Sequence, residues 1–396
     1  MILNYDFLAP QRIVFGWGRR RELGTLARTL GCRAFVVLGS RTLHKNGTWD
    51  EIAALLQSSG IEANLAATIS REPEVVDVDQ LTETLRRHNA APGDFLLGLG
   101  GGAAIDLAKA TSALVTNRHG QSVRDFLEGV GKGLDVTEPP LPMLAMPTTG
   151  GTGTEATKNA VITVLPSPPG RGVGGEGLPP VKKSIRSPLM VPRIVLVDPE
   201  LSVSVPPTTT AWTGMDAITQ LIESYICRFA KPIPQALAIH GLQLALPMVR
   251  EAVRDGQARP AREAMAHAAL LSGLALANSG LGFAHGVAAA LGVHADVPHG
   301  LACAMMLPVA LRVNRQVAEK PLAELAHAVQ LGGADALIGR IDELCAALNV
   351  PTKLSQVGVR PEQLDDLVRG SRGNSMNGNP RQLSDAELHA VLEECL

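Results

Sequence analysis

The chain reads Phe95-Leu-Leu-Gly-Leu-Gly-Gly-Gly-Ala-Ala-Ile-Asp-Leu-Ala-Lys109, an apolar run that breaks into three glycines and continues with helix-forming residues. This order predicts a buried strand, a turn and a helix that begins at about Ala103. Gly100, Gly101 and Gly102 have no Cβ, so the backbone could approach a ligand closely, and the helix N-terminus would offer free N–H groups to an anion. The stretch is a candidate pyrophosphate site, although a tight turn that needs positive φ would give the same residues.

The glycine spacing differs from the G-x-G-x-x-G pattern of the common dinucleotide fold, so a nucleotide would bind here in a related but different manner. Asp106 and Lys109 lie one helical turn apart in the same stretch. The simplest expectation for these two side chains is a solvated ion pair.

Strands and helices alternate through the first half of the chain. Apolar runs predict strands at 12–15, 34–38, 62–68, 95–99, 143–146 and 159–165, with helical patterns at 19–30, 49–59 and 75–89. Uninterrupted apolar strands are typical of a parallel sheet that is covered on both faces. The pattern predicts a Rossmann-like α/β domain over residues 1–200, in which ligands collect at the carboxyl ends of the strands.

The residues that follow the apolar run 34–38 bear on the choice of cofactor. Gly39, Ser40 and Arg41 include no acid. An Asp or Glu at this point would hydrogen-bond the adenosine ribose and repel a phosphate, whereas Ser40 and Arg41 could accept one. The residues slightly favour NADP over NAD, and an ordinary polar loop is the alternative.

A second loop rich in glycine and hydroxyl groups follows the strand expected at 143–146. It reads Pro147-Thr-Thr-Gly-Gly-Thr-Gly-Thr-Glu155 and could supply backbone amides and small donors to phosphates and to an amide-bearing ring. Residues 166–180 are mostly proline and glycine and have no apolar period, which predicts an inserted flexible loop of no catalytic use.

Beyond about residue 200 the strand patterns stop and helical periods continue, so we expect an all-α domain over residues 201–396. The chain has 396 residues, of which 45% are hydrophobic and 3% aromatic, and a net charge of −2. These values suit two ordinary cores and give no electrostatic reason to expect nucleic acid or a membrane surface as a partner. Small molecules are the expected partners.

The cysteines are scattered and odd in number, and none forms a C-x-x-C pair. They favour a reducing compartment, argue against a thiolate zinc site and are expected to be packing residues: Cys32, Cys227, Cys303, Cys345 and Cys395. The first residues have no signal-peptide pattern, and Asn278, Ser279 and His285 interrupt the apolar run 273–293. We therefore expect a cytoplasmic protein without a membrane span.

One carboxylate, one amide and two imidazoles in the second half could form a metal site. Asp216 and Gln220 are four residues apart on one expected helix and share a face, and His285 and His299 follow. Oxygen and nitrogen donors of this kind suit Fe(II) or Zn. A buried helix-end acid and a hydrogen-bonded core histidine are the alternatives.

Taken together and in order, these motifs resemble the iron-containing, or group III, alcohol dehydrogenase family over nearly the whole chain. The resemblance is carried by Gly100-Gly-Gly-Ala-Ala-Ile-Asp-Leu-Ala-Lys109, Pro147-Thr-Thr-Gly-Gly-Thr-Gly-Thr-Glu155, Gly214-Met-Asp216, His285-Gly286, Pro298-His-Gly300 and Gly378-Asn-Pro-Arg381. It implies an N-terminal dinucleotide domain and a helical C-terminal domain, as in the related dehydroquinate synthase architecture, with a divalent metal in the cleft between them and commonly a homodimer.

The resemblance also assigns residues. The implied cofactor contacts are Gly100, Gly101, Gly102, Asp106, Thr148, Thr149, Thr152 and Lys182. The implied metal ligands are Asp216, Gln220, His285 and His299. The family's usual set is one Asp and three His, so an amide stands at 220 in place of an imidazole, and we expect a weaker metal affinity because an amide oxygen is the poorer donor for late first-row metals.

A second departure from the family pattern is Ala289, where many members have a histidine that faces the substrate and transfers a proton. His294 is near in sequence and is our candidate catalytic residue, either as a proton acceptor or as the missing metal ligand. A simple pocket-lining or surface histidine is the alternative.

These residues predict an NAD(P)-dependent, metal-assisted dehydrogenase that transfers hydride between nicotinamide and a small alcohol or its carbonyl partner. One alternative is a metal-independent reductase of an oxo acid or enone, similar to maleylacetate reductases. Another is a lyase of the dehydroquinate synthase type, and the third is a non-catalytic nucleotide-binding remnant. The lyase would require a Lys and Arg cluster around the metal, and the stretch from His285 to Ala295 has none.

Overall fold

The computed structural model describes residues 4–165 and 180–396, which form two compact units. The α/β unit comprises Leu8–Thr149 and Thr154–Ser202. The helical unit comprises Val203–Leu396 together with Gly150–Gly153 and the N-terminal residues up to Phe7. Apart from residue 180, the proline and glycine insertion expected at 166–180 lies outside the described residues.

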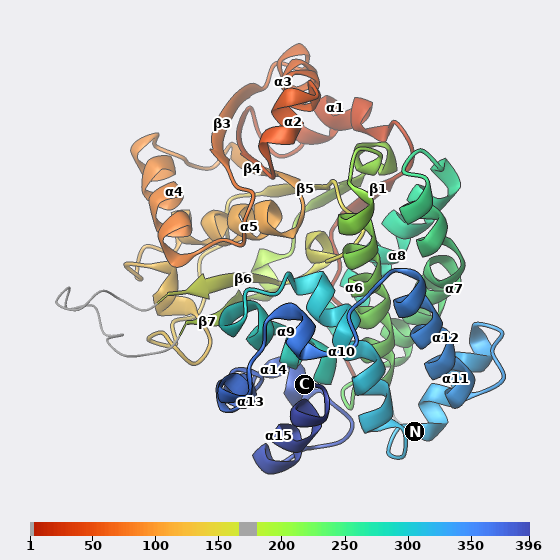
Figure 1. The fold of residues 1–396 in the computed structure, drawn as a ribbon. Helices are drawn as coiled ribbons and strands as arrows, with labels where there is room; N and C mark the ends of the chain where they lie inside the picture. Colours follow the sequence, from red (N-terminus) through yellow and green to blue (C-terminus); the bar gives the residue numbers. More distant parts are fainter. Residues whose placement is uncertain (1–3, 166–179) are drawn as a thin grey trace. The chain divides into compact units, whose positions relative to one another are not determined.

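The α/β unit is built on a six-stranded parallel sheet (Figure 1). Five of the six expected strands belong to it; the run expected at 159–165 lies in a separate sheet, and the sixth parallel strand, at 194–197, was not predicted from the sequence. Its spatial order is β1-β8-β5-β4-β2-β3. The strands are β1 (Arg12–Phe15), β2 (Arg33–Leu38), β3 (Glu62–Thr68), β4 (Asp94–Gly100), β5 (Met143–Pro147) and β8 (Ile194–Val197). Two further strands, β6 (Asn159–Val164) and β7 (Val181–Arg186), pair antiparallel in a separate sheet.

Each face of the parallel sheet is covered, which explains why its central strands are apolar throughout. The helices of the unit are α1 (Leu23–Ala27), α2 (Arg41–Lys45), α3 (Thr48–Ser58), α4 (Val75–Arg87) and α5 (Gly102–Thr116). Alternate residues of β2 enter different cores: Phe35 and Val37 pack with α4 and α5, whereas Val36 packs with α1 and α3. Since side chains alternate across a strand, one apolar run serves two cores.

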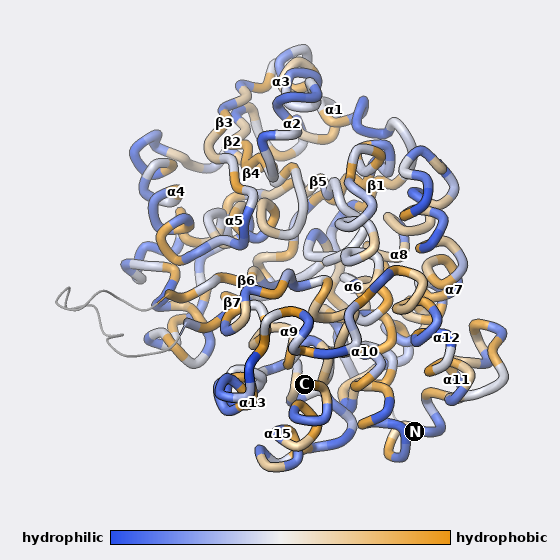
Figure 2. The backbone as a smooth tube through the Cα atoms, viewed as in Figure 1, coloured by the Kyte–Doolittle hydropathy of each residue, from blue (hydrophilic) through white to orange (hydrophobic). Residues whose placement is uncertain are grey.

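Helices α4 and α5 differ in how their sequences are buried. In α4 the buried residues Val78, Leu81, Thr82 and Leu85 follow a helical period, and hydrophilic and hydrophobic segments alternate along it (Figure 2). In contrast, α5 is buried on nearly all sides and is rich in alanine. Its small side chains allow the helix to lie close to β4, where a Cβ on Gly98 would come within 3.2 Å of the Ile105 backbone.

The first expected helix is shorter than its sequence pattern. Residues 19–30 form a 3-10 turn at Arg19–Glu22 and then α1, which ends at Ala27, rather than a helix that continues to Leu30. The helical unit, by contrast, has no strand among its described residues, as its sequence predicted.

Long helices make up the core of the helical unit. They are α6 (Pro207–Ile226), α7 (Pro232–Arg254), α8 (Arg259–Asn278), α9 (Phe283–His294) and α10 (His299–Asn314). The remaining helices are α11 (Glu319–Ala328), α12 (Ala334–Ala347), α13 (Leu364–Gly370), α14 (Asn374–Asn377) and α15 (Asp385–Glu394). Across 4–165 and 180–396 no single helix is long and apolar enough to span a membrane; α8 and α9 reach that length only as a pair bent by 101°.

Candidate nucleotide and metal sites

The glycine turn of the α/β unit lies where the order of the strands reverses. From β2 the chain runs outward to β3, and from β4 it runs the other way to β5, so the switch point falls between β2 and β4. Ligands of open parallel sheets bind at such points, outside the carboxyl ends of the strands. The turn at Gly100 and the end of β2 at Gly39 meet here, since Gly39 N donates a hydrogen bond to Leu99 O at 2.8 Å.

The glycines at this edge are required by close backbone contact. A Cβ on Gly100 would lie 2.5 Å from Gly39 Cα, and Gly100 has φ +158°. At Gly101 a Cβ would meet only Thr149, at 3.5 Å. The backbone of the turn is therefore packed on one side and approachable on the other, and the N-terminus of α5 follows it directly, which fits a pyrophosphate.

Apart from Asp106 on α5, the predicted cofactor residues fall into three groups. Ser40, Arg41, Gly100, Gly101, Gly102, Thr148 and Thr149 follow the carboxyl ends of the neighbouring strands β2, β4 and β5. Thr152 belongs with Gly150–Gly153 to the helical unit. Lys182 lies on β7, where its Nζ pairs with Glu72 at 2.5 Å.

Asp106 and Lys109 form a buried pair, so the expectation of a solvated one was wrong. Lys109 is fully buried, and its Nζ lies 4.0 Å from Asp106 Oδ1 and donates to Thr154 O at 2.6 Å and Asn159 O at 2.8 Å. Burial, offset in part by Asp106, lowers the pKa of Lys109 to about 8. The carboxylate of Asp106 accepts hydrogen bonds from the Thr154 hydroxyl and Val161 N. The pair fastens α5 to the loop that follows β5.

Within the helical unit, residues 150–153 of the second glycine loop pack against α6 and α8. A Cβ on Gly151 would lie 2.6 Å from Thr213 of α6, and a Cβ on Gly153 would lie 2.5 Å from Gly273 N of α8. Gly153 also has φ +61°, in the left-handed region that favours glycine. Its glycines are therefore explained by packing as well as by the expected cofactor.

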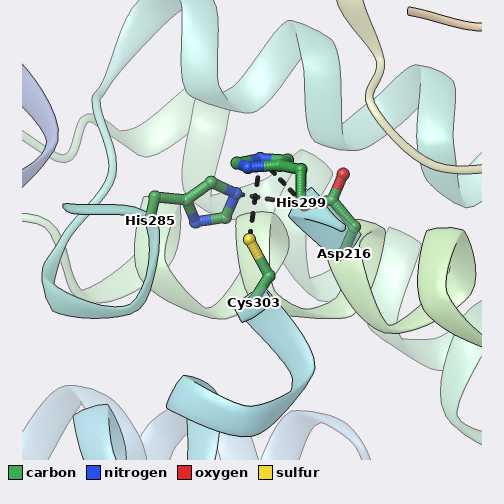
Figure 3. Close-up of side chains that lie close together, drawn as sticks. All are labelled: Asp216, His285, His299 and Cys303. Carbon is green, nitrogen blue, oxygen red and sulfur yellow. Dashed lines mark hydrogen bonds and ion pairs between the residues drawn. The ribbon is translucent and has the colours of Figure 1, made fainter. Parts of the chain in front are cut away.

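In the helical unit, Asp216, His285, His299 and Cys303 bring their donor atoms within 4.8 Å of one another (Figure 3). His285 Nε2 lies 3.2 Å from Asp216 Oδ1, and His299 Nε2 lies 3.9 Å from the same oxygen. Asp216 comes from the middle of α6, His285 from the first turn of α9 and His299 from the first residue of α10. Three of the four predicted metal ligands are thus brought together.

Glu223 supports the start of α9 and orients His285. Its carboxylate accepts hydrogen bonds from Gly282 N at 3.1 Å and Ala284 N at 2.6 Å, which caps the N-terminus of α9. It also lies 2.7 Å from His285 Nδ1, so it accepts the proton of that nitrogen and leaves Nε2 to face Asp216. Such a carboxylate behind a histidine is typical of metal sites.

Charge in the cluster shifts the titration of its members. Burial acts to raise the pKa of Asp216, yet the hydrogen bond with His285 and the nearby His299 hold that pKa below its ordinary value. Burial acts to lower the pKa of both imidazoles, but Cys303 and Asp216 outweigh it: the pKa of His285 lies well above its ordinary value and that of His299 rises to about 8. Because a metal competes with these protons, its affinity should increase with pH.

The cluster fits a divalent cation. It offers one carboxylate, two imidazoles and a sulfur at close range, and a carboxylate orients one imidazole from behind. Asp216, His285 and Cys303 are buried, while the side chain of His299 keeps 32% of its surface exposed, so one side of the cluster is reachable.

Gln220 and His294 have other contacts. Gln220 is buried one turn after Asp216, and its Oε1 lies 2.7 Å from Ser272 Oγ of α8. His294 is the last residue of α9 and packs against Gly370 of α13; a Cβ on that glycine would lie 3.1 Å from His294 Nε2. His294 lies nine positions after His285 on α9, which corresponds to a rise of about 13.5 Å along the helix. The ligand role of Gln220 and the catalytic role of His294 stay predictions.

Sequence reasoning missed Glu223 and Cys303. Cys303 was expected to be a packing residue, yet its Sγ lies 3.6 Å from His299 Nε2. One signal was available: His299 and Cys303 are four residues apart, so they share a face of one helix. Asn379, in the C-terminal motif of the predicted family, accepts a hydrogen bond from Phe283 N and so supports the start of α9.

Comparison with known proteins covers both units. The family described as iron-containing alcohol dehydrogenase matches residues 10–199, and the C-terminal part of the Fe-containing alcohol dehydrogenase family matches residues 210–396. Alcohol dehydrogenase 4 of Schizosaccharomyces pombe is 30% identical over 98% of this chain and 89% of its own length. The NADPH-dependent butanol dehydrogenase of Clostridium saccharobutylicum is also 30% identical, over 98% of this chain and 97% of its own.

A solved structure agrees. The sulfoacetaldehyde reductase of Bifidobacterium kashiwanohense, in complex with NAD+, superimposes with a TM-score of 0.87 at 28% identity, over 100% of this chain and 99% of the other. These matches and the two sites define an NAD(P)-dependent oxidoreductase that acts on CH–OH groups. Within that class, the chain belongs to the iron-containing alcohol dehydrogenase family. The oxo-acid reductase and lyase alternatives are not favoured by these relatives.

Proposed function

We propose that this protein interconverts a small alcohol and its aldehyde or ketone. Hydride passes to or from the nicotinamide of NAD(P), and a divalent metal, Fe(II) or Zn, assists the reaction as a Lewis acid. The observation that carries the proposal is the cluster of Asp216, His285 and His299, in which Glu223 orients His285. Relatives named as a butanol dehydrogenase and a sulfoacetaldehyde reductase support small alcohols and aldehydes as the substrate class.

The chain's own residues divide the work. Asp216, His285 and His299 would hold the metal, with the predicted Gln220 as a further ligand from the next turn of α6. When bound, the metal would supply Lewis-acid chemistry that lowers the pKa of the substrate hydroxyl. With the metal bound, Glu223 would keep the proton of His285 on Nδ1, so that Nε2 could coordinate through its lone pair.

The proton of the alcohol must leave without a histidine at position 289, because that position is an alanine. We propose that it leaves through water or the ribose of the cofactor, with His294 as the predicted alternative. The glycine and threonine loops after β4 and β5 would bind and orient the cofactor.

We further propose a slight preference for NADP, supported by Ser40 and Arg41 at the end of β2 and by the absence of an acid at 39–41. Arg41→Ala should raise the KM for NADPH by about tenfold, the effect of one lost charge-assisted contact, and leave the KM for NADH unchanged. Equal effects on both cofactors would contradict the preference.

The homodimer that the family resemblance implies is testable by sedimentation.

The test of the function is metal analysis of protein purified without chelators, combined with turnover. We expect about one metal per chain, and reduction of propanal or butanal by NADPH or NADH that falls on metal removal and returns with Fe(II) or Zn. Bound nucleotide without aldehyde turnover under any metal load would refute the proposal, and an oxo-acid panel would then identify a metal-independent reductase.

A further inference from the structure

Cys303 lies inside the cluster rather than beside it. Its side chain is fully buried, its Sγ is 3.6 Å from His299 Nε2, and it interacts with Asp216 and His285 as well. Figure 3 shows the sulfur pointing from α10 toward the two imidazoles. No other described cysteine joins a group of candidate ligands of this kind.

The fold fixes this position. His299 and Cys303 lie one turn apart on α10, so both side chains leave the same face of the helix. Gly300 brings that helix close to α6, since a Cβ there would lie 2.6 Å from Trp212 O. Asp216 follows Trp212 by one turn of α6, so the sulfur and the imidazole are presented to its carboxylate by a tightly packed helix pair.

Two of the distances between donor atoms match those around a four-coordinate ion. Nitrogen and oxygen ligands at about 2.0–2.1 Å and sulfur at about 2.3 Å from a tetrahedral centre lie about 3.3 Å (N to O) and about 3.6 Å (N to S) apart. In the protein, His285 Nε2 to Asp216 Oδ1 is 3.2 Å and Cys303 Sγ to His299 Nε2 is 3.6 Å. A third distance, His299 Nε2 to Asp216 Oδ1, is longer at 3.9 Å, and all four donor atoms lie within 4.8 Å of one another.

Position 220, where the family's usual ligand set has a histidine, is a glutamine in this chain. Gln220 directs its Oε1 to Ser272 Oγ, at 2.7 Å. A thiolate and a carboxylate together also cancel the charge of a divalent cation, which matters in a buried site because an uncompensated charge there is costly.

We propose that Cys303 is a metal ligand, completing a set with Asp216, His285 and His299 in place of the absent third imidazole, and that the site therefore prefers Zn(II) to Fe(II). Thiolate ligands favour the softer ion. On binding, the sulfur gives up its proton to solvent and forms the bond to the metal. This inference rests on the proposed metal-assisted function and names the ligand set of the same site.

Cobalt(II) is the probe, because a thiolate bound to Co(II) gives a charge-transfer band in the near ultraviolet that oxygen and nitrogen ligands do not give. The full chain is stripped of metal and titrated with Co(II). We expect the band in the wild-type protein and its loss in Cys303→Ser. Cys345→Ser is the matched control, since Cys345 is another buried thiol, on α12, outside the cluster; it should keep the band.

A competition between Zn(II) and Fe(II) gives the second measurement. Zinc affinity should fall by at least about tenfold in Cys303→Ser, since loss of even an outer-shell partner costs that much. It should stay unchanged in Cys345→Ser.

The outcomes separate the two proposals. Bound Co(II) with visible d–d bands, aldehyde turnover and no charge-transfer band in the wild-type protein would overturn thiolate ligation and leave the proposed function standing. No bound cobalt and no metal-dependent turnover would overturn both. The wild-type spectrum alone decides the ligand question even if Cys303→Ser does not fold.

Discussion

At the scale of single residues, Glu223 links the fold of α9 to the chemistry of His285. Glu223→Gln should lower metal affinity about 10- to 100-fold, because the amide no longer holds His285 by a charge-assisted hydrogen bond. It should also cost about 1–3 kcal/mol of stability, since backbone donors at the start of α9 lose their anionic partner. Metal titration and thermal unfolding measure the two effects.

The matched control for this prediction is Glu251→Gln. Glu251 lies on α7 and pairs with Arg254. It should leave metal affinity unchanged. If Glu223→Gln binds metal as tightly as the wild-type protein, Glu223 serves only to cap α9 and does not orient the histidine.

Glu155, buried beside Lys109 and Asp106, gives a second prediction at this scale. Burial raises its pKa from 4.5 to about 7. Between these values the folded protein holds a proton that the unfolded chain has lost, so this group makes stability fall as pH rises from about 4.5 to 7. Glu155→Gln should remove the effect and raise stability at pH 8 by about 2 kcal/mol.

The measurement for Glu155 is unfolding of both proteins at pH 4 and at pH 8. At pH 4 the carboxyl is protonated in both states, so the variant should differ little from the wild-type protein. An equal stability difference at the two pH values would show that the glutamate does not titrate in this window.

At the scale of elements, the turn between β4 and α5 can be tested by substitution, because it lies at the switch point of the sheet. Gly100→Ala should destabilise the protein by about 2–4 kcal/mol and abolish nucleotide binding, because its Cβ would lie 2.5 Å from Gly39 Cα at a φ that L residues rarely adopt.

Gly101→Ala is the neighbouring control for that turn. Its Cβ would meet only Thr149, at 3.5 Å, so the fold should remain as stable as the wild type within about 0.5 kcal/mol. Thermal unfolding and a nucleotide titration compare the pair. Similar losses of stability in both variants would mean that the packing of Gly39 on Gly100 is not what fixes the turn.

Elements of this kind could be predicted where local pattern decides them. Apolar runs located β2, β4 and β5, and three glycines located the turn after β4, because burial and backbone freedom leave their signature within a few residues. The solvation of Lys109 and the place of Cys303 could not be predicted in the same way. Each depends on a neighbour 40 to 90 residues away in the chain, such as Asn159 for Lys109 and Asp216 for Cys303.

At the scale of the molecule, the two kinds of site belong to different compact units. The glycine turn and the ends of β2 and β5 lie in the α/β unit, and the cluster with Asp216 lies in the helical unit. Each unit has its own core, so a change in one cluster should leave the local structure of the other intact.

Asp216→Ala tests this separation. It should abolish metal binding, because the carboxylate lies within 4 Å of both imidazoles, and lower kcat by about a hundredfold or more, the worth of several kcal/mol of Lewis-acid assistance. Nucleotide affinity should stay within about twofold of the wild-type value. Asp216→Asn is the control for packing in α6, because the asparagine side chain has nearly the same volume as that of aspartate. Metal content, NADPH fluorescence titration and aldehyde turnover are measured on the same preparations. Unchanged turnover would refute the metal mechanism, whereas loss of nucleotide binding in Asp216→Asn would show that the two units are energetically coupled through this carboxylate.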